Sequence, residues 1–184
     1  MNSRIPSLAL ALALAVPCLA NAADYTVQPG STLGFSSNFQ GSSFAGHFEK
    51  WTAAISYDPT QLAASKFDVT VNLATAKTGD NDRDSALPGT DFFDVAKYPQ
   101  AHFVTTAFHQ QGNQVIADGM LTLRGVTKPV SLSVTFKPQG QAATLDVSGT
   151  VKRLDFGVGG GQYADTSVIG PDVKVTAHLV LAGK

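Results

Sequence analysis

The carboxylates with the most suggestive spacing lie in the segment 80–91. Asp80, Asp82 and Asp84 alternate along the chain and Asp91 stands at the twelfth position, which resembles a calcium-binding loop. The glycine that such a loop requires at its sixth position is missing. Short polar side chains also cap the first turn of a helix, and Asn81 or Asp82 could do so here. The spacing therefore favours a capped helix over a calcium site.

The histidines do not form a metal-binding pattern. His47, His102, His109 and His178 are scattered along the chain, and no two of them have HxH or HExxH spacing. The sequence has no phosphate-binding loop and no Gly-x-Ser-x-Gly nucleophile elbow. Serine, histidine and aspartate are all available, but nothing places three of them together. We therefore expect no catalysis, no bound metal and no cofactor.

Phe92-Phe93 is the most unusual apolar feature of the chain. The pair stands between Asp91 and Asp94, in a segment that Pro88-Gly89 marks as a connection rather than a strand. Core packing is the ordinary explanation for an aromatic side chain. An aromatic pair in a connection could instead cap the open end of a β-barrel.

Arg83-Asp84 precedes this aromatic pair. In the simplest interpretation Arg83 forms a local ion pair, which at an exposed site contributes about 0–1 kcal/mol. In the functional interpretation Arg83 contacts the polar head of a molecule held below the aromatic cap. The residues alone favour the ion pair.

Period-two alternation organises most of the chain. In Phe67-Val69-Val71-Leu73 and Val130-Leu132-Val134-Phe136, apolar residues alternate with polar ones, which predicts antiparallel strands with one face on a core. Turn residues such as Asp58-Pro59 separate the runs. Short helical segments are expected at 60–65 and 81–97, the second broken by its Pro-Gly pair. The expected strands are residues 25–28 together with 31–39, then 43–57, 66–75, 101–109, 113–123, 127–137, 142–153 and 172–182.

About eight antiparallel strands with one apolar face can form either a sandwich or a closed barrel. Periodicity does not distinguish the two. The long first hairpin, residues 31–57, and the aromatic residues on its alternating face favour the barrel. The sequence therefore predicts an all-β, eight-stranded antiparallel barrel with one or two short helical connections.

Residues 1–22 have the layout of a secretory signal peptide. Arg4 is followed by an apolar run and then by the small residues of a cleavage site at Ala20-Asn21-Ala22. Cys18, the single cysteine, lies inside this leader, so no disulfide is expected in residues 23–184, which fit one domain. Removing Arg4 makes the formal net charge of −1 one unit more negative, and no basic stripe for nucleic acid is present.

Several short motifs occur in an order that resembles the YceI family of periplasmic lipid-binding proteins. The resemblance implies a lipocalin-like barrel that holds a polyisoprenoid or fatty chain in an elongated apolar tunnel. At Ala86-Leu87 the chain departs from the histidine-leucine common in the family, and this form resembles a subgroup associated with membrane b-type cytochromes. The matching residues are Tyr25, Gly46-x-Phe48, Arg83-Asp84, Asp91-Phe92-Phe93-Asp94-Val95-x-Lys97-Tyr98-Pro99, Phe103, Leu121-Thr122-Leu123-x-Gly125-Val126-Thr127-Lys128-Pro129-Val130 and Arg153-x-Asp155-Phe156-Gly157.

The leading hypothesis is therefore a periplasmic, non-catalytic carrier or sequestering protein for an isoprenoid lipid or quinone. The alternative is an accessory partner that presents quinone to a membrane b-type cytochrome in a redox or stress-response pathway. Pairing of two copies into a homodimer is left open. Arg83 is the candidate headgroup contact. The residues expected to line or cap the tunnel are Leu33, Phe35, Phe39, Phe44, Phe48, Trp51, Val71, Phe92, Phe93, Phe103, Met120 and Leu121.

Overall fold

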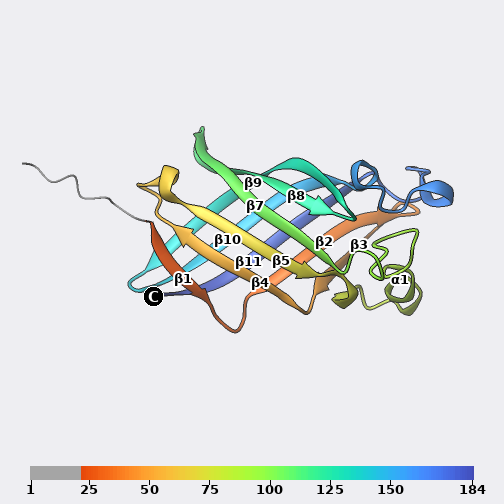
Figure 1. The fold of residues 1–184 in the computed structure, drawn as a ribbon, viewed down its shortest axis with the longest axis horizontal. Coiled ribbons are helices and arrows are strands. Elements are labelled where there is room, and N and C mark those ends of the chain that lie inside the picture. The colour runs from red at the N-terminus through yellow and green to blue at the C-terminus, as the bar shows by residue number, and fades with distance from the viewer. Residues whose placement is uncertain (1–21) are drawn as a thin grey trace, which may run out of the picture.

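Eleven β segments form one antiparallel sheet that closes on itself (Figure 1). The computed structural model describes residues 22–184, so the predicted leader lies outside the described residues except for Ala22. The segments are β1 (Ala23–Val27), β2 (Thr32–Phe39), β3 (Ser42–Phe48), β4 (Trp51–Tyr57), β5 (Lys66–Asn72), β6 (Ala76–Lys77), β7 (Gln100–Gln111), β8 (Gln114–Leu123), β9 (Val126–Gln139), β10 (Ala142–Lys152) and β11 (Asp172–Gly183).

These eleven segments amount to eight strands, because three of the strands are interrupted. β1 and β2 pair with different parts of β11, so they form one strand broken at residues 28–31. β3 and β4 form a second strand, broken at Glu49-Lys50, and β5 and β6 a third, broken by the 3₁₀ turn η2 (Leu73–Thr75). Each strand pairs with the next along the chain, and β11 returns to the first. The predicted eight-stranded antiparallel barrel is confirmed.

The helices are shorter than the sequence pattern suggests. The segment expected at 60–65 contains only the 3₁₀ turn η1 (Leu62–Ala64). The segment expected at 81–97 contains α1 (Asn81–Ala86), followed by turns after the Pro-Gly pair. Two further 3₁₀ turns are η3 (Arg153–Phe156) and η4 (Gly161–Tyr163). No helix in residues 22–184 is long and apolar enough to span a membrane.

One end of the barrel, here called the far end, is filled by packed aromatic rings. The ring centroids of Tyr57 and Phe136 are 5.0 Å apart, and those of Phe67 and Phe108 are 4.9 Å apart. Tyr25 packs edge-on against Phe136. The side chain of Tyr57 is only 1% exposed, and its burial raises the pKa of its phenol. A dense aromatic plug therefore closes this end.

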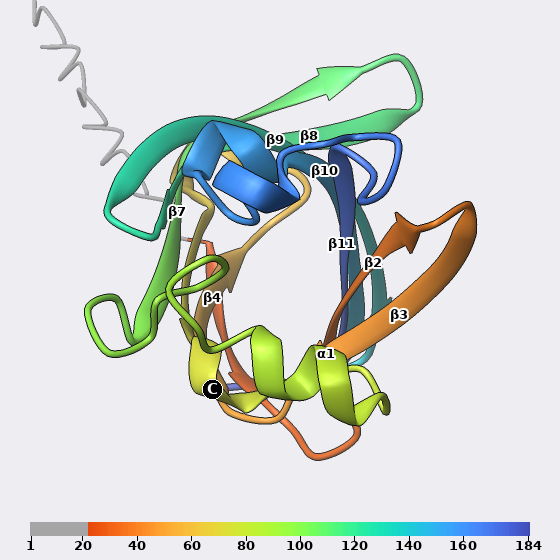
Figure 2. The same cartoon turned by 90° about the vertical axis from the view of Figure 1, so that its right-hand side faces the viewer.

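The opposite end, here called the capped end, is covered by connections between strands. Figure 2 looks onto it and shows α1 and the β10–β11 connection nearest the viewer. The β6–β7 connection spans residues 78–99 and the β10–β11 connection spans residues 153–171. The amide of Gly159 donates to the carbonyl of Asp91 over 2.8 Å, which ties the two connections together. Their sequences therefore determine what lies over this end of the barrel.

Candidate functional site

A partly open apolar cavity occupies the barrel between the aromatic plug and the capped end. Its volume is about 240 Å³, and its wall exposes only apolar atoms. Side chains from β2 to β5 and from β7 to β11 contribute to the wall, together with residues of both capping connections. Alternation explains this wall, because every second residue of each strand points inward.

The cavity is long and narrow. Its lining on β11 runs from Val173 to Leu179, and the six steps between these residues, at a rise of about 3.4 Å each, span roughly 20 Å along the strand. Ile55 and Phe67 line the part of the cavity nearest the far end, and they belong to the cluster of buried residues around the aromatic plug. A volume of about 240 Å³ spread over that length leaves room for one extended chain.

Two glycines make room for aromatic rings at the cavity wall. A Cβ on Gly46 would lie 2.4 Å from Cζ of Phe35, and a Cβ on Gly119 would lie 2.5 Å from Cζ of Phe103. Both phenylalanines line the cavity. A larger residue at either glycine would place its side chain where the phenylalanine ring of the neighbouring strand now lies.

Most of the residues expected to line the tunnel do line this cavity. Phe39 and Met120 do not. Met120 lies next to the inward-facing Leu121, and neighbouring residues of a strand point to opposite faces. Phe39 alternates in step with the inward-facing Leu33 and Phe35, but it stands at the exposed end of β2. The ten expected residues that line the cavity are Leu33, Phe35, Phe44, Phe48, Trp51, Val71, Phe92, Phe93, Phe103 and Leu121.

Phe92 and Phe93 have different environments, although both line the cavity. Phe93 is 8% exposed and packs near Phe48, with ring centroids 6.3 Å apart. Phe92 is less buried and packs at 5.0 Å against the ring of Tyr163, which lies in the β10–β11 connection. Phe93 therefore belongs to the core, while Phe92 is the cavity-facing half of a contact between the two capping connections.

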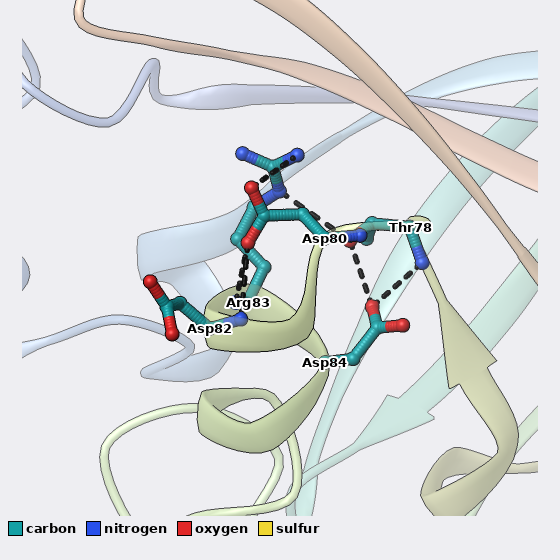
Figure 3. Close-up of polar contacts among 5 residues, drawn as sticks. All are labelled: Thr78, Asp80, Asp82, Arg83 and Asp84. Atoms are coloured by element: carbon teal, nitrogen blue, oxygen red, sulfur yellow. Dashed lines mark hydrogen bonds and ion pairs between the residues drawn. The ribbon is translucent and has the colours of Figure 1, made fainter.

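Arg83 lies beside the cavity and does not line it. Its guanidinium carbon is 4.8 Å from the ring centroid of Phe44, a cavity residue, and its Nη2 is 3.3 Å from Oδ2 of Asp80. Figure 3 shows this pair at the start of α1, together with Asp84, whose carboxylate accepts hydrogen bonds from Thr78. The ion pair favoured by the sequence is present, and the guanidinium also covers the edge of the cavity wall.

The carboxylates of this segment serve local structure. Asp80 caps α1 by accepting from the amides of Asp82 and Arg83, so the cap is Asp80 rather than Asn81 or Asp82. Residues 22–184 contain no group of three or more histidine, cysteine or acidic side chains that could hold a metal ion. Three histidines instead contact single aspartates on adjacent strands. These pairs are His102 with Asp68, His109 with Asp118 and His178 with Asp146.

Arg153, which the sequence offered only as part of a family motif, has a structural role at this site that the sequence did not predict. It is 3% exposed, and its guanidinium donates to the backbone carbonyls of the connection that follows it. Burial lowers its pKa. All five of its N–H groups can be occupied in this way, so its charge is stabilised by carbonyl dipoles while its polar atoms stay out of the cavity. The accepting residues are Val158, Gly159, Tyr163, Ile169 and Gly170.

The cap has an apolar inner side and an outer side that carries both polar and apolar groups. Phe92 and Val158 line the cavity, whereas their neighbours Asp91 and Gly157 line a cleft of mixed polarity outside it. Arg124 joins the two connections across this cleft by donating to the carbonyls of Gly157 and Thr90, the latter at 2.6 Å. A single layer of residues therefore separates the apolar interior from the outer surface of the cap.

A closed up-and-down barrel around an apolar cavity defines a class of β-barrel binding protein in which the ligand lies inside the barrel. Residues 25–181 match the model of the YceI-like domain. The chain belongs to the YceI family.

Similar proteins cover most of the chain. A UPF0312 protein of Pseudomonas savastanoi pv. phaseolicola is 34% identical over 171 residues, covering 87% of this chain and 89% of the relative. The crystal structure of BcnA from Burkholderia cenocepacia has a TM-score of 0.80 at 32% identity, covering 84% of this chain and 99% of that one. A Saccharophagus degradans domain described as polyisoprenoid binding shares the fold at a TM-score of 0.66 and 16% identity, covering 90% and 100%.

Proposed function

We propose that this protein binds the chain of an isoprenoid lipid or isoprenoid quinone inside the barrel and carries or sequesters it in the periplasm. The observation that carries the proposal is the long, narrow cavity with a wholly apolar wall. Such a wall stabilises a hydrocarbon chain by about 0.8 kcal/mol for each methylene removed from water. It offers a polar head no hydrogen-bond partner, so the head must lie outside the cavity.

One protein that shares the fold supports the same class of ligand. The Saccharophagus degradans domain that shares this fold is described as polyisoprenoid binding. The periplasmic location rests on the signal-peptide layout of residues 1–22. No step of the proposed function requires covalent chemistry. Discrimination among chains of similar width should be weak, because the wall has no polar group that could reject one of them.

Arg83 is the residue that we propose for contact with a headgroup. Its side chain is about one-third exposed and lies over Phe44, which lines the cavity. A guanidinium in this position has donors to spare beyond its contact with Asp80. It could therefore meet a polar head that emerges beside α1, while the apolar chain remains inside.

The proposal is tested by native mass spectrometry of the protein isolated from its host periplasm, followed by lipid identification after denaturation. We expect one isoprenoid molecule per chain. In parallel, the fluorescence of Trp51, the only tryptophan and a cavity residue, should report titration with geranylgeraniol. A protein that carries no lipid and does not bind geranylgeraniol would refute the proposal.

A matched pair of variants separates binding in the cavity from binding on the surface. Ala177 lines the cavity in the middle of β11, and Thr176 beside it is exposed. Ala177→Phe should fill the bore and weaken geranylgeraniol binding by at least about tenfold. Thr176→Phe adds a similar ring on the outside and should leave binding unchanged. Equal affinities of the two variants would place the ligand outside the barrel.

A further inference from the structure

The cavity is closed at the far end and bounded on its sides by the sheet. Tyr57 in the aromatic plug is almost completely buried, and each strand is hydrogen-bonded to its neighbours around the ring. The capped end is built from connections, which are held together by fewer backbone hydrogen bonds than the sheet. If the proposed function is correct, an apolar chain therefore enters and leaves through the capped end.

Exposed apolar side chains gather at this same end. Among residues 22–184, the large hydrophobic side chains that are exposed have exposed fractions of 36–39%, and all of them lie in capping connections or at strand tips beside them. None lies at the far end or on the middle of the barrel wall. These residues, here called the apolar rim, are Phe39, Val126, Leu154, Tyr163 and Val168.

The apolar rim is continuous with the cavity. Tyr163 packs against Phe92, which lines the cavity. Phe39 forms an isolated β-bridge with Ile169, which also lines the cavity and follows Val168 in the chain. At both places one residue separates the outer apolar surface from the interior. A chain moving between outside and inside would therefore remain in contact with apolar side chains.

We propose that the apolar rim docks the barrel end-on against a lipid bilayer, so that the ligand chain passes from the bilayer to the cavity with little exposure to water. Exposed apolar groups rimmed by polar residues are typical of interaction surfaces, and shallow insertion of such groups holds proteins at the membrane interface. A bilayer is the favoured occupant because the rim leads into a cavity whose proposed ligand is a membrane lipid.

Charge at the capped end specifies the kind of bilayer. Aspartates outnumber basic residues in the two capping connections and the β8–β9 turn, and Lys77, Lys128 and Lys152 at the adjoining strand ends only bring the two signs into balance, so the capped end has no excess of positive charge for anionic headgroups. Docking should therefore depend on apolar contact with a zwitterionic surface and change little with salt. The aspartates are at positions 80, 82, 84, 91, 94, 155 and 165, and the basic residues are at 83, 97, 124 and 153.

Vesicle flotation tests this docking directly. The protein should float with phosphatidylethanolamine–phosphatidylcholine vesicles, and added phosphatidylglycerol should not increase the bound fraction. The triple variant Phe39→Ser, Tyr163→Ser, Val168→Ser should lose binding by at least about tenfold, because it removes three of the inserting side chains. Val104→Thr with Met120→Gln is the matched control, since these paired residues lie on the outer barrel wall. The control should float like the wild type.

A fluorescence experiment checks the orientation. In a Trp51→Phe background, Tyr163→Trp places the only tryptophan on the apolar rim, and lipids brominated on their acyl chains should quench it. Absence of quenching would overturn the proposal.

The same measurements separate this proposal from the proposed function. Geranylgeraniol delivered from ethanol could bind even though the protein does not float with vesicles and takes up geranylgeraniol from vesicles no faster than the triple variant does. In that case the docking proposal is wrong and the binding function stands. If geranylgeraniol does not bind at all, the proposed function itself fails. A concentration-dependent dimer that the triple variant abolishes would show that a second copy covers the apolar rim, and would also overturn docking to a bilayer.

Discussion

The guanidinium of Arg153 lies so close to Gly159 that a side chain there would collide with it. A Cβ on Gly159 would be 2.7 Å from Nη1 of Arg153, and the backbone of Gly159 has a φ of +63°. The same Cβ would lie 3.2 Å from Cε1 of Phe92. Arg153 and Phe92 therefore approach this glycine together, and the β10–β11 connection is fixed at that point.

Replacing Arg153 should release this connection. Arg153→Met removes the donors to five buried or half-buried carbonyls, and we expect the free energy of unfolding to fall by about 3 kcal/mol or more. Hydrogen exchange should accelerate in residues 157–171 before it changes in the strands. Lys152→Met, on the exposed neighbour, is the control. Unchanged exchange in 157–171 would show that other contacts hold the connection.

Phe92→Ala and Phe93→Ala should differ in effect. Phe93→Ala removes a buried ring and should cost about 3–5 kcal/mol of stability. Phe92→Ala should cost less and should mainly speed the release of geranylgeraniol, because Phe92 joins the cavity to Tyr163. Thermal unfolding and stopped-flow Trp51 fluorescence measure the two effects. Equal loss of stability with unchanged release would assign both rings to the core alone.

Gly119→Ala should distort the cavity wall. The added Cβ would lie 2.5 Å from the Phe103 ring and 2.6 Å from the carbonyl oxygen of Val104, so neither can move away freely. We expect a loss of about 1–3 kcal/mol in stability and weaker geranylgeraniol binding as the ring is pushed inward. Gly119→Ala combined with Phe103→Ala should recover part of the affinity. A single variant as stable as the wild type would contradict the geometry.

The attachment of α1 should be lost in acid. The hydroxyl of Thr78 donates to Asp84, with its backbone amide as a second donor, and these bonds lower the pKa of the Asp84 carboxyl. The folded state favours the ionised carboxylate of Asp84. The resulting stabilisation is therefore full above about pH 4, the pKa of an aspartate in the unfolded chain, and is lost as the pH falls through the lowered pKa of the folded state. The Thr78 amide resonance should follow this titration. Asp84→Asn should move the Thr78 amide resonance, at neutral pH, to the position it has in acid. Asp82→Asn should leave this resonance unchanged.

Alternation and turn residues were enough to predict the strands, because a barrel with one buried face imposes period two on every strand. The same rule could have excluded Met120, since Met120 and Leu121 cannot both face inward. Phe39 illustrates a different limit. Alternation predicts that its side chain points inward, but alternation does not show where a strand extends past the edge of the barrel.

Arg153 and the aromatic plug show what the pattern could not supply. A buried arginine whose partners are backbone carbonyls has no partner in the sequence, since any residue carries a carbonyl. Tyr57 and Phe136 are distant in the chain and meet only because the barrel closes. Alternation indicates that both face inward, but not at which height each lies. Hence the sequence could not predict that one end of the barrel is plugged.

The three interrupted strands are consecutive, and two of their interruptions lie side by side. The amide of Glu49 donates to the carbonyl of Thr75, and the amide of Asn72 donates to that of Lys50, so two of the breaks are in direct contact. β7 to β11, on the other flank, run unbroken except for a bulge between Thr105 and Ala107. The barrel thus has one flank of continuous strands and one flank that carries a transverse seam. We expect a thicker chain to be accommodated by a change at that seam, while the ladder of β7 to β11 keeps its register.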